Sequence, residues 1–117
     1  MSTPALPSYS SGTSTVPLLG DTIGANLDRT AGRVADAEAL VECATGRRFS
    51  YAEFVAEVDA CALGLDALGV GKGDRVGIWA PNCAEWAFVQ YGTAKLGAIL
   101  VNINPAYRTH EPACFST

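Results

Sequence analysis

The first clear pattern in the chain is an alternation of apolar and polar positions at residues 38–43. The alternation places Ala39, Val41 and Cys43 on one face of a predicted strand. Thr45-Gly46 and a second short run at 47–49 follow directly. An alternating run, a glycine turn and another short run predict a small β-hairpin.

A helical pattern begins immediately after this hairpin. Ser50 and Glu53 form an S-x-x-E capping box, in which each side chain accepts a hydrogen bond from the backbone of the other residue. Apolar residues then recur every three or four positions, which predicts one buried helix face. The members of this stripe are Phe54, Val58, Cys61, Leu65 and Leu68. We expect Gly69 to end the helix as the C′ residue.

The second half of the chain has the order strand, helix, strand. The apolar run at 74–80 (DRVGIWA) is strand-like. We expect Asn82 and Glu85 to cap a helix that is apolar almost all round and that Gly97 closes. Residues 98–103 (AILVNI) then predict a second buried strand. The order and length are those of a βαβ unit with parallel strands.

The N-terminal part predicts an extended leader followed by one short helix. Residues 1–20 combine three prolines with Ser and Thr, a composition typical of extended or disordered segments. From Asp21, a possible N-cap, apolar residues recur at near-helical spacing to a helix end near Gly32. These positions are Ile23, Leu27, Ala31 and Val34. The expected fold class is therefore α/β: short helix, small hairpin, helix, and βαβ unit.

Composition and charge restrict the classes of protein. The 117 residues are 49% hydrophobic and 17% charged with a net charge of -4, which is ordinary for an acidic globular chain. The eight Lys and Arg residues form no basic stripe, so no nucleic-acid partner is expected. The sequence shows no signal-peptide pattern and no apolar run near the roughly 18 residues of a membrane span. We therefore expect a cytoplasmic protein with no transmembrane segment.

Two glycine-containing segments have compositions found in phosphate-binding loops. The run Gly69–Gly73 follows a predicted helix and precedes a predicted strand. The helix end nearest to this run is the negative C-terminus, which disfavours a bound phosphate. We therefore interpret the run as a turn between helix and strand. Residues 10–17 (SSGTSTVP) partly resemble the Ser/Thr/Gly loop of adenylate-forming enzymes. That loop has glycine where this chain has Thr15 and lysine where it has Leu18. We interpret residues 10–17 as part of the leader.

Cysteine and histidine residues predict no metal site and no catalytic pair. The four cysteines contain no CxxC pair and are expected to be free thiols: Cys43, Cys61, Cys83 and Cys114. Cys43 and Cys61 are interpreted as small core residues. The single histidine, His110, lies beside Glu111 without a placed nucleophile, and we expect it at the surface.

Trp79 and Trp86 bracket the turn between the first βαβ strand and its helix. Aromatic residues at such a turn usually contribute packing, although they could line a ligand pocket. From these residues we assign no catalytic, cofactor-binding or metal-binding residue to the chain.

The runs GDRVGIWAPNCAEW (73–86) and AKLGAILVNINPAYRTHE (94–111) strongly resemble the adenylate-forming (AMP-binding) superfamily. Within it, the sequence is most similar to bacterial fatty acyl-CoA synthetases. The likeness extends upstream through RFSYAE (48–53) and includes PLLGDTIG (17–24) in the leader. It covers about residues 8–111, so we divide the chain into an extended leader (1–20), a partial AMP-binding N-terminal subdomain (21–111) and a non-family tail (112–117).

The resemblance implies a two-step ligase that uses ATP, magnesium and coenzyme A. A fatty acid or other carboxylic acid would form an acyl-adenylate, and the thiol of coenzyme A would then displace AMP. The family performs this with a Thr/Ser-Gly-Thr-Thr-Gly-x-Pro-Lys-Gly loop, an adenine-binding aromatic segment, an acidic ribose ligand and a mobile lysine. None of these motifs occurs in the 117 residues. We therefore expect the chain to bind none of these cofactors and to be inactive alone.

The likeness stops after Glu111, where the family continues into a helix and this chain has Pro112. We expect an N-terminal fragment or a shifted reading frame. The alternatives are a stand-alone small α/β binding or interaction module, and a truncated product without a function. The oligomeric state and the acyl chain length stay open. For the isolated chain we expect partial folding, aggregation, or rescue by the remainder of a synthetase, because a two-stranded parallel unit leaves edges and faces uncovered.

Overall fold

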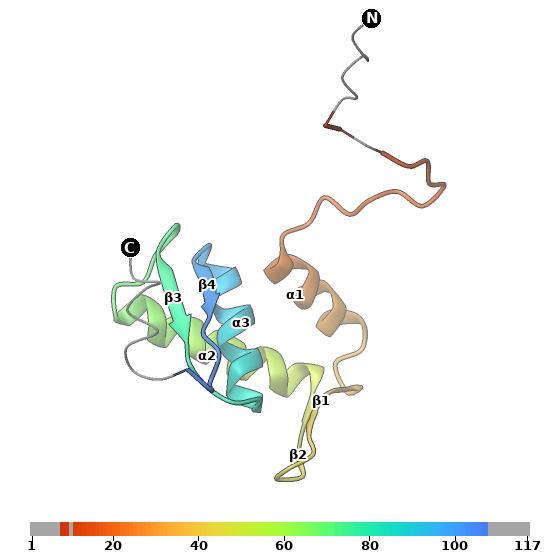
Figure 1. Ribbon diagram of the computed structural model, residues 1–117. Helices are drawn as coiled ribbons and strands as arrows, with labels where there is room; N and C mark the ends of the chain where they lie inside the picture. The colour runs from red at the N-terminus through yellow and green to blue at the C-terminus, as the bar shows by residue number, and fades with distance from the viewer. Residues whose placement is uncertain (1–7, 10, 108–117) are drawn as a thin grey trace, which may run out of the picture.

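The elements of the computed structural model, which describes residues 8, 9 and 11–107, follow the predicted order (Figure 1). Its helices are α1 (Ile23–Arg33), α2 (Tyr51–Ala67) and α3 (Ala84–Leu96). The hairpin is formed by β1 (Glu38–Glu42) and β2 (Arg47–Ser50), which are antiparallel. The strands β3 (Arg75–Ile78) and β4 (Ile99–Asn102) pair in parallel on either side of α3 in the sequence. The predicted α/β class, hairpin and parallel unit are confirmed.

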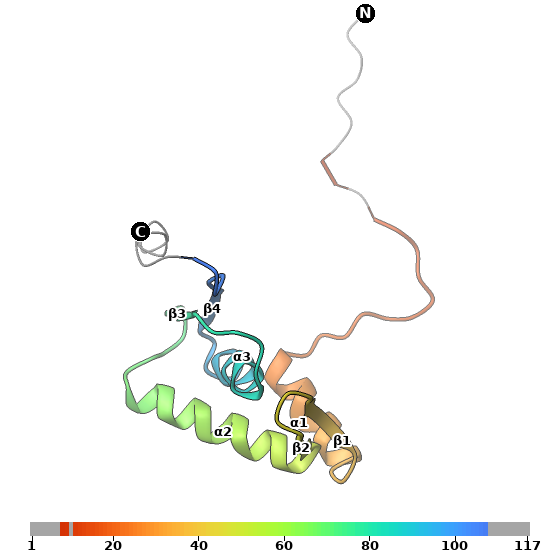
Figure 2. The same ribbon diagram turned by 60° about the horizontal axis from the view of Figure 1, so that its bottom comes forward.

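Helix α3 is the central element of the described chain. It packs against α1, α2, β1 and β4, and Figure 2 shows it between the β3–β4 pair and the other two helices. Of its 13 residues, only Glu85 and Gln90 are exposed. A helix apolar almost all round was predicted, and its position between two layers explains why it needs this composition.

The core lies where α2, α3 and the hairpin meet. Its buried members come from all three helices: Leu27, Phe54, Val58, Ala84 and Phe88. The Phe88 ring packs edge-on against Phe49 of β2, with centroids 5.3 Å apart, and lies 5.7 Å from the Phe54 ring of α2. Such aromatic pairs contribute about 0.5–1.5 kcal/mol beyond the burial of their surface. The Phe88 ring therefore links α3 to both β2 and α2.

Helix α2 begins and ends as the sequence predicts. The Glu53 amide donates to Ser50 Oγ over 3.2 Å, and the Ser50 amide donates to Glu53 Oε2 over 2.8 Å, which completes the capping box. At the other end Gly69 has φ +89°, and the Val70 amide donates to the Leu65 carbonyl over 3.0 Å. This is a Schellman ending, in which only glycine adopts the C′ conformation without strain.

The apolar stripe of α2 differs from the prediction at its C-terminal end. Phe54 and Val58 are buried as expected, but Ala62 is buried as well, and Leu68 is 82% exposed. Leu68 is the C-cap, at the end of α2. Its predicted place in the core is wrong because the described chain packs no element against that end of the helix.

The predicted start of α1 is also corrected. Its N-cap is Thr22, whose Oγ1 accepts from the Ala25 amide over 3.2 Å, whereas Asp21 forms an ion pair with Arg29. Leu27 and Ala31 are buried, but two other apolar positions, Ile23 and Val34, are 63% and 43% exposed. Both lie at the ends of the helix: Ile23 is its first residue and lines a pocket with Gln90 and Thr93 of α3, and Val34 follows its last residue.

Residues 11–20 of the leader run away from the body of the molecule (Figure 1) and are exposed throughout. Within the segment that resembles a phosphate loop, the Val16 amide donates to Ser14 Oγ over 3.1 Å, which is a local Ser turn. The predictions for His110, Glu111, Cys114 and the tail at 112–117 lie outside the described residues.

Candidate functional site

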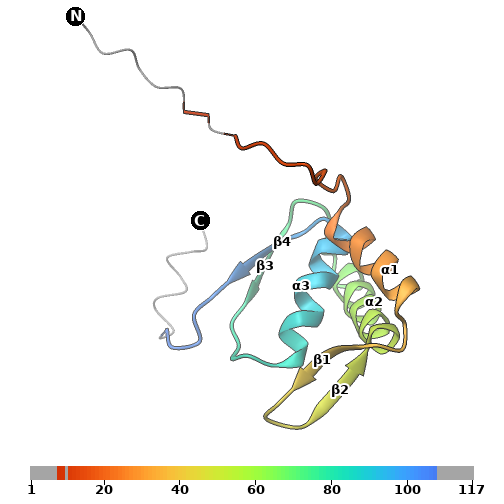
Figure 3. The same cartoon turned by 90° about the vertical axis from the view of Figure 1, so that its right-hand side faces the viewer.

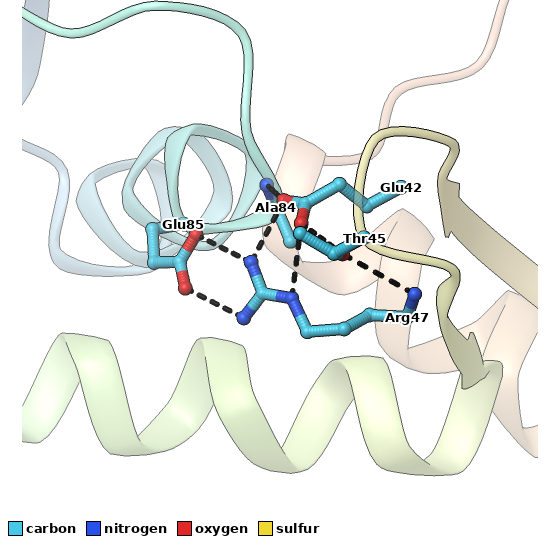
Figure 4. A network of polar contacts seen from close by, with 5 residues as sticks. All are labelled: Glu42, Thr45, Arg47, Ala84 and Glu85. Atoms are coloured by element: carbon cyan, nitrogen blue, oxygen red, sulfur yellow. Dashed lines mark hydrogen bonds and ion pairs between the residues drawn. The ribbon is translucent and has the colours of Figure 1, made fainter.

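A network of charged residues joins the hairpin to the N-terminus of α3 (Figure 4). Glu42 ends β1 and Arg47 begins β2, and the antiparallel register places them directly opposite each other across the turn. Thr45 lies within that turn. Ala84 and Glu85 are the first two residues of α3. The fold therefore brings together two segments about 40 residues apart in the sequence.

The cap of α3 comes from the hairpin and not from the helix itself. The predicted capping by Asn82 and Glu85 is wrong: Cys83 is the N-cap residue and its side chain makes no capping hydrogen bond. Instead, the Ala84 amide donates to Glu42 Oε2 over 2.7 Å. A carboxylate at a helix N-terminus satisfies a free N–H and interacts favourably with the helix dipole. Because this contact depends on tertiary structure, no local motif could have indicated it.

Arg47 binds two carboxylates at once. Its Nε and Nη2 donate to the Glu42 carboxylate over 3.1 and 2.7 Å, and its Nη1 and Nη2 donate to the Glu85 carboxylate over 2.7 and 2.9 Å. The Thr45 hydroxyl also donates to Glu42. Bidentate guanidinium–carboxylate pairs have a fixed geometry. Arg47 therefore holds the hairpin turn against the first turn of α3.

These contacts decide what the carboxylates can do chemically. Hydrogen bonds from Arg47, Thr45 and the Ala84 amide lower the pKa of Glu42 to about 2, and the Arg47 guanidinium lowers the pKa of Glu85 to about 2. The pKa of Arg47 is raised in turn, first by Glu85 and then by Glu42. All three groups remain charged at neutral pH, so neither carboxylate is suited to exchange protons there. The network is a structural clamp.

The clamp predicts a loss of stability in acid. Both carboxylates have a folded pKa below the ordinary value of 4.5, so their stabilisation is complete above that value and is lost as the pH falls toward 2. We expect the thermal midpoint of the chain to fall across this window at constant ionic strength. The variant Arg47→Met should lower the midpoint at pH 7 and flatten the profile between pH 5 and 2. An Arg47→Met profile as steep as that of the wild type would contradict the role of the clamp.

A second charged cluster ties the three helices together. Lys95 of α3 donates from Nζ to Asp28 of α1 and to Asp59 of α2, each over 2.6 Å. The lysine side chain is only 15% exposed. Burial alone would lower the pKa of Lys95, but the hydrogen bonds to the two aspartates outweigh it and the pKa is raised. The Lys95 ammonium is paired with both aspartates, so this cluster also acts as a structural contact between the three helices.

The residues singled out from the sequence do not form a common site. Cys43 lies in the exposed hairpin turn, so its prediction as a core residue is wrong: β1 ends one residue earlier, at Glu42. Cys61 is half-buried, and burial raises the pKa of its thiol. Cys43, Cys61 and Cys83 are all free thiols, as predicted. Trp79 is 46% exposed.

Residues 8, 9 and 11–107 contain no cluster of three or more His, Cys, Asp or Glu side chains placed to hold a metal ion. Among them no helix has the length and apolar character needed to cross a membrane. Glu42, Arg47 and Lys95 are not predicted from the sequence. The one local signal is the opposite charge of Glu42 and Arg47 on either side of the turn.

Comparison with known proteins identifies the family. The model of the AMP-binding enzyme family matches residues 27–114. The chain belongs to this family. It is 45% identical over 104 residues to the mitochondrial medium-chain acyl-CoA ligase ACSF2 of Danio rerio, and 45% identical over 94 residues to the putative acyl-CoA synthetase YngI of Bacillus subtilis. These matches cover 89% and 80% of this chain, but it spans only 17% of each relative.

Solved structures agree with this assignment. The model resembles a Mycobacterium tuberculosis fatty acyl CoA synthetase with a TM-score of 0.77 and 39% identity, over 80% of this chain and 19% of that one. It matches the N-terminal domain of FACL13 from the same organism with the same TM-score, over 80% of this chain and 24% of that domain. The N-terminal subdomain of Klebsiella oxytoca NpsA shares the fold, with a TM-score of 0.73. The architecture is that of part of the N-terminal subdomain of adenylate-forming enzymes.

Proposed function

We propose that this chain is the leading part of the N-terminal subdomain of an ATP-dependent fatty acid–CoA ligase. The observation that carries the proposal is the 45% identity to acyl-CoA ligases across nearly nine tenths of the chain. In the complete enzyme, ATP and a carboxylic acid would give an acyl-adenylate and pyrophosphate, and the thiol of coenzyme A would displace AMP to give the thioester. Magnesium would neutralise phosphate charge.

The part of this chain in that enzyme is to build a scaffold. Its charged networks are ion pairs that join elements to one another. We assign none of its residues to catalysis or to ATP, magnesium or coenzyme A. The division into leader (1–20), partial subdomain (21–111) and tail (112–117), the cytoplasmic location and the fatty-acid substrate stay predictions.

The proposal is tested by ATP–pyrophosphate exchange with a fatty acid, which reports the first half-reaction alone. The purified 117-residue chain should give no exchange above the blank, while the complete Bacillus relative serves as the positive control. Exchange by the isolated chain that saturates with ATP and fatty acid would show that it contains a complete adenylating site, and the proposal would fail.

A further inference from the structure

Two free thiols flank the contact that joins the hairpin to α3. Cys43 directly follows Glu42, the last residue of β1, and Cys83 directly precedes Ala84, the first residue of α3. The Ala84 amide donates to Glu42 Oε2 over 2.7 Å. This hydrogen bond holds together the two chain segments that carry the cysteines, although they lie far apart in the sequence. Figure 3 shows the end of the hairpin next to the start of α3.

The two cysteines also line one pocket. Its other lining residues come from the hairpin and from the start of α3: Leu40, Val41, Glu42, Ala44, Asn82 and Ala84. Cys61 is the third cysteine of the described residues and lies elsewhere, on α2, where its Sγ would lie 3.3 Å from a Cβ on Gly92 of α3. Cys43 and Cys83 therefore share a space that Cys61 does not reach.

Both cysteines lie at the ends of regular elements. Cys83 is the N-cap residue of α3, and its side chain makes no capping hydrogen bond. Cys43 lies in the hairpin turn, beyond the last pair of the ladder, which joins Glu42 to Arg47. A disulfide requires Cβ atoms about 3.5–4.5 Å apart. At these positions the side chains can approach each other without breaking the strand ladder or the helix.

We propose that Cys43 and Cys83 form a reversible dithiol–disulfide site whose oxidant is a low-molecular-weight disulfide. The exposed Cys43 thiolate attacks one sulfur of the oxidant, which releases one thiol and leaves a mixed disulfide on Cys43. The Cys83 thiolate then attacks the Cys43 sulfur and releases the second thiol. Two protein thiols are thus oxidised to one disulfide, their two protons pass to the released thiolates, and the oxidant is reduced to two thiols.

The new bond joins the hairpin turn to the start of α3, beside the ion pairs of the clamp. Where disulfides form in reducing compartments, they are usually transient and redox-sensing. The site therefore makes the attachment of the hairpin to α3 dependent on the thiol–disulfide balance. No step uses ATP or a carboxylic acid, so the inference is independent of the proposed function.

The test oxidises the full 117-residue chain with oxidised glutathione at low protein concentration. Remaining thiols are blocked with iodoacetamide, and linked peptides are identified by mass spectrometry. In an unfolded chain, loop-closure entropy favours the pair Cys43–Cys61, about 18 positions apart, over Cys43–Cys83, about 40 positions apart, by about threefold. In native buffer we expect Cys43–Cys83 as the main product, with its ratio to Cys43–Cys61 at least about tenfold higher than in concentrated urea.

Two variants separate the roles of the cysteines. Cys83→Ser should leave Cys43 as a stable mixed disulfide with glutathione, because the second attack is lost. The matched control Cys61→Ser should leave the Cys43–Cys83 bond unchanged. Dithiothreitol should restore the free thiols of the wild type.

The comparison of native buffer with urea uses the wild type alone, so it does not depend on the folding of a variant. The proposal is overturned by the same pairing ratio in both solvents or by a stable mixed disulfide on Cys43 of the wild type. It is equally overturned by a bond to Cys114 as the main product, or by loss of the Cys43–Cys83 bond in Cys61→Ser.

Discussion

Replacing Phe88 with alanine should destabilise the chain by about 3–5 kcal/mol, as expected for the truncation of a buried phenylalanine. The Phe88 side chain is 7% exposed and contacts rings from β2 and α2, so its loss leaves a cavity where three elements meet. Domains of this kind are stable by only about 5–15 kcal/mol in total. The partial folding expected for the isolated chain leaves even less margin, so Phe88→Ala should abolish most of the helical circular dichroism signal at 222 nm and any cooperative thermal transition.

The control for this prediction is Tyr9→Ala. Tyr9 is an aromatic residue of similar size that is 77% exposed in the leader, so its removal should change stability by less than about 0.5 kcal/mol. If Phe88→Ala and Tyr9→Ala melted at the same temperature, the assignment of Phe88 to the core would be wrong.

The second large effect is expected at Gly92, where α3 packs closely against α2. A Cβ on Gly92 would lie 3.3 Å from the backbone nitrogen of Ala62 and 3.3 Å from Cys61 Sγ. The backbone of α2 cannot move without disturbing the helix, so Gly92→Leu must push the two helices apart. Overpacking of this kind costs about 1–3 kcal/mol, which the urea midpoint measures.

Gly64→Ala is the matched control, because Gly64 is also a helical glycine but has no atom within 4 Å of the position of a new Cβ. Alanine is the better helix former by roughly 1 kcal/mol, so this variant should be more stable than the wild type. The two glycine replacements should thus change stability in opposite directions. A stabilising Gly92→Leu would contradict the packing of α2 against α3.

The features that the sequence predicts correctly are those set by local chemistry. The capping box at Ser50 and Glu53, the hairpin turn, and the glycines that end α2 and α3 each depend on a few adjacent residues. The resemblance to adenylate-forming enzymes also rests on short contiguous runs, and the family match confirms it.

Predictions that depend on the environment of an element could not be made from the sequence. Leu68 fits the apolar stripe of α2, but whether it is buried depends on what packs against that end of the helix. The cap of α3 is supplied by Glu42, which lies 42 residues from Ala84 in the chain. The Lys95 cluster unites three helices in the same way. The periodicity of apolar residues shows which face of a helix is apolar. It does not show which other element packs against that face.

The central claim is that this chain forms one part of an acyl-CoA ligase, and replacement in a relative tests it most directly. In the Bacillus relative, the matching 94-residue segment is exchanged for the corresponding residues of this chain, and acyl-CoA formation from a carboxylic acid, ATP and coenzyme A is measured. We predict that the chimera retains kcat/KM within about tenfold of the parent, a cost of about 1.4 kcal/mol in transition-state stabilisation. A folded chimera no more active than the parent lacking the segment would contradict the claim.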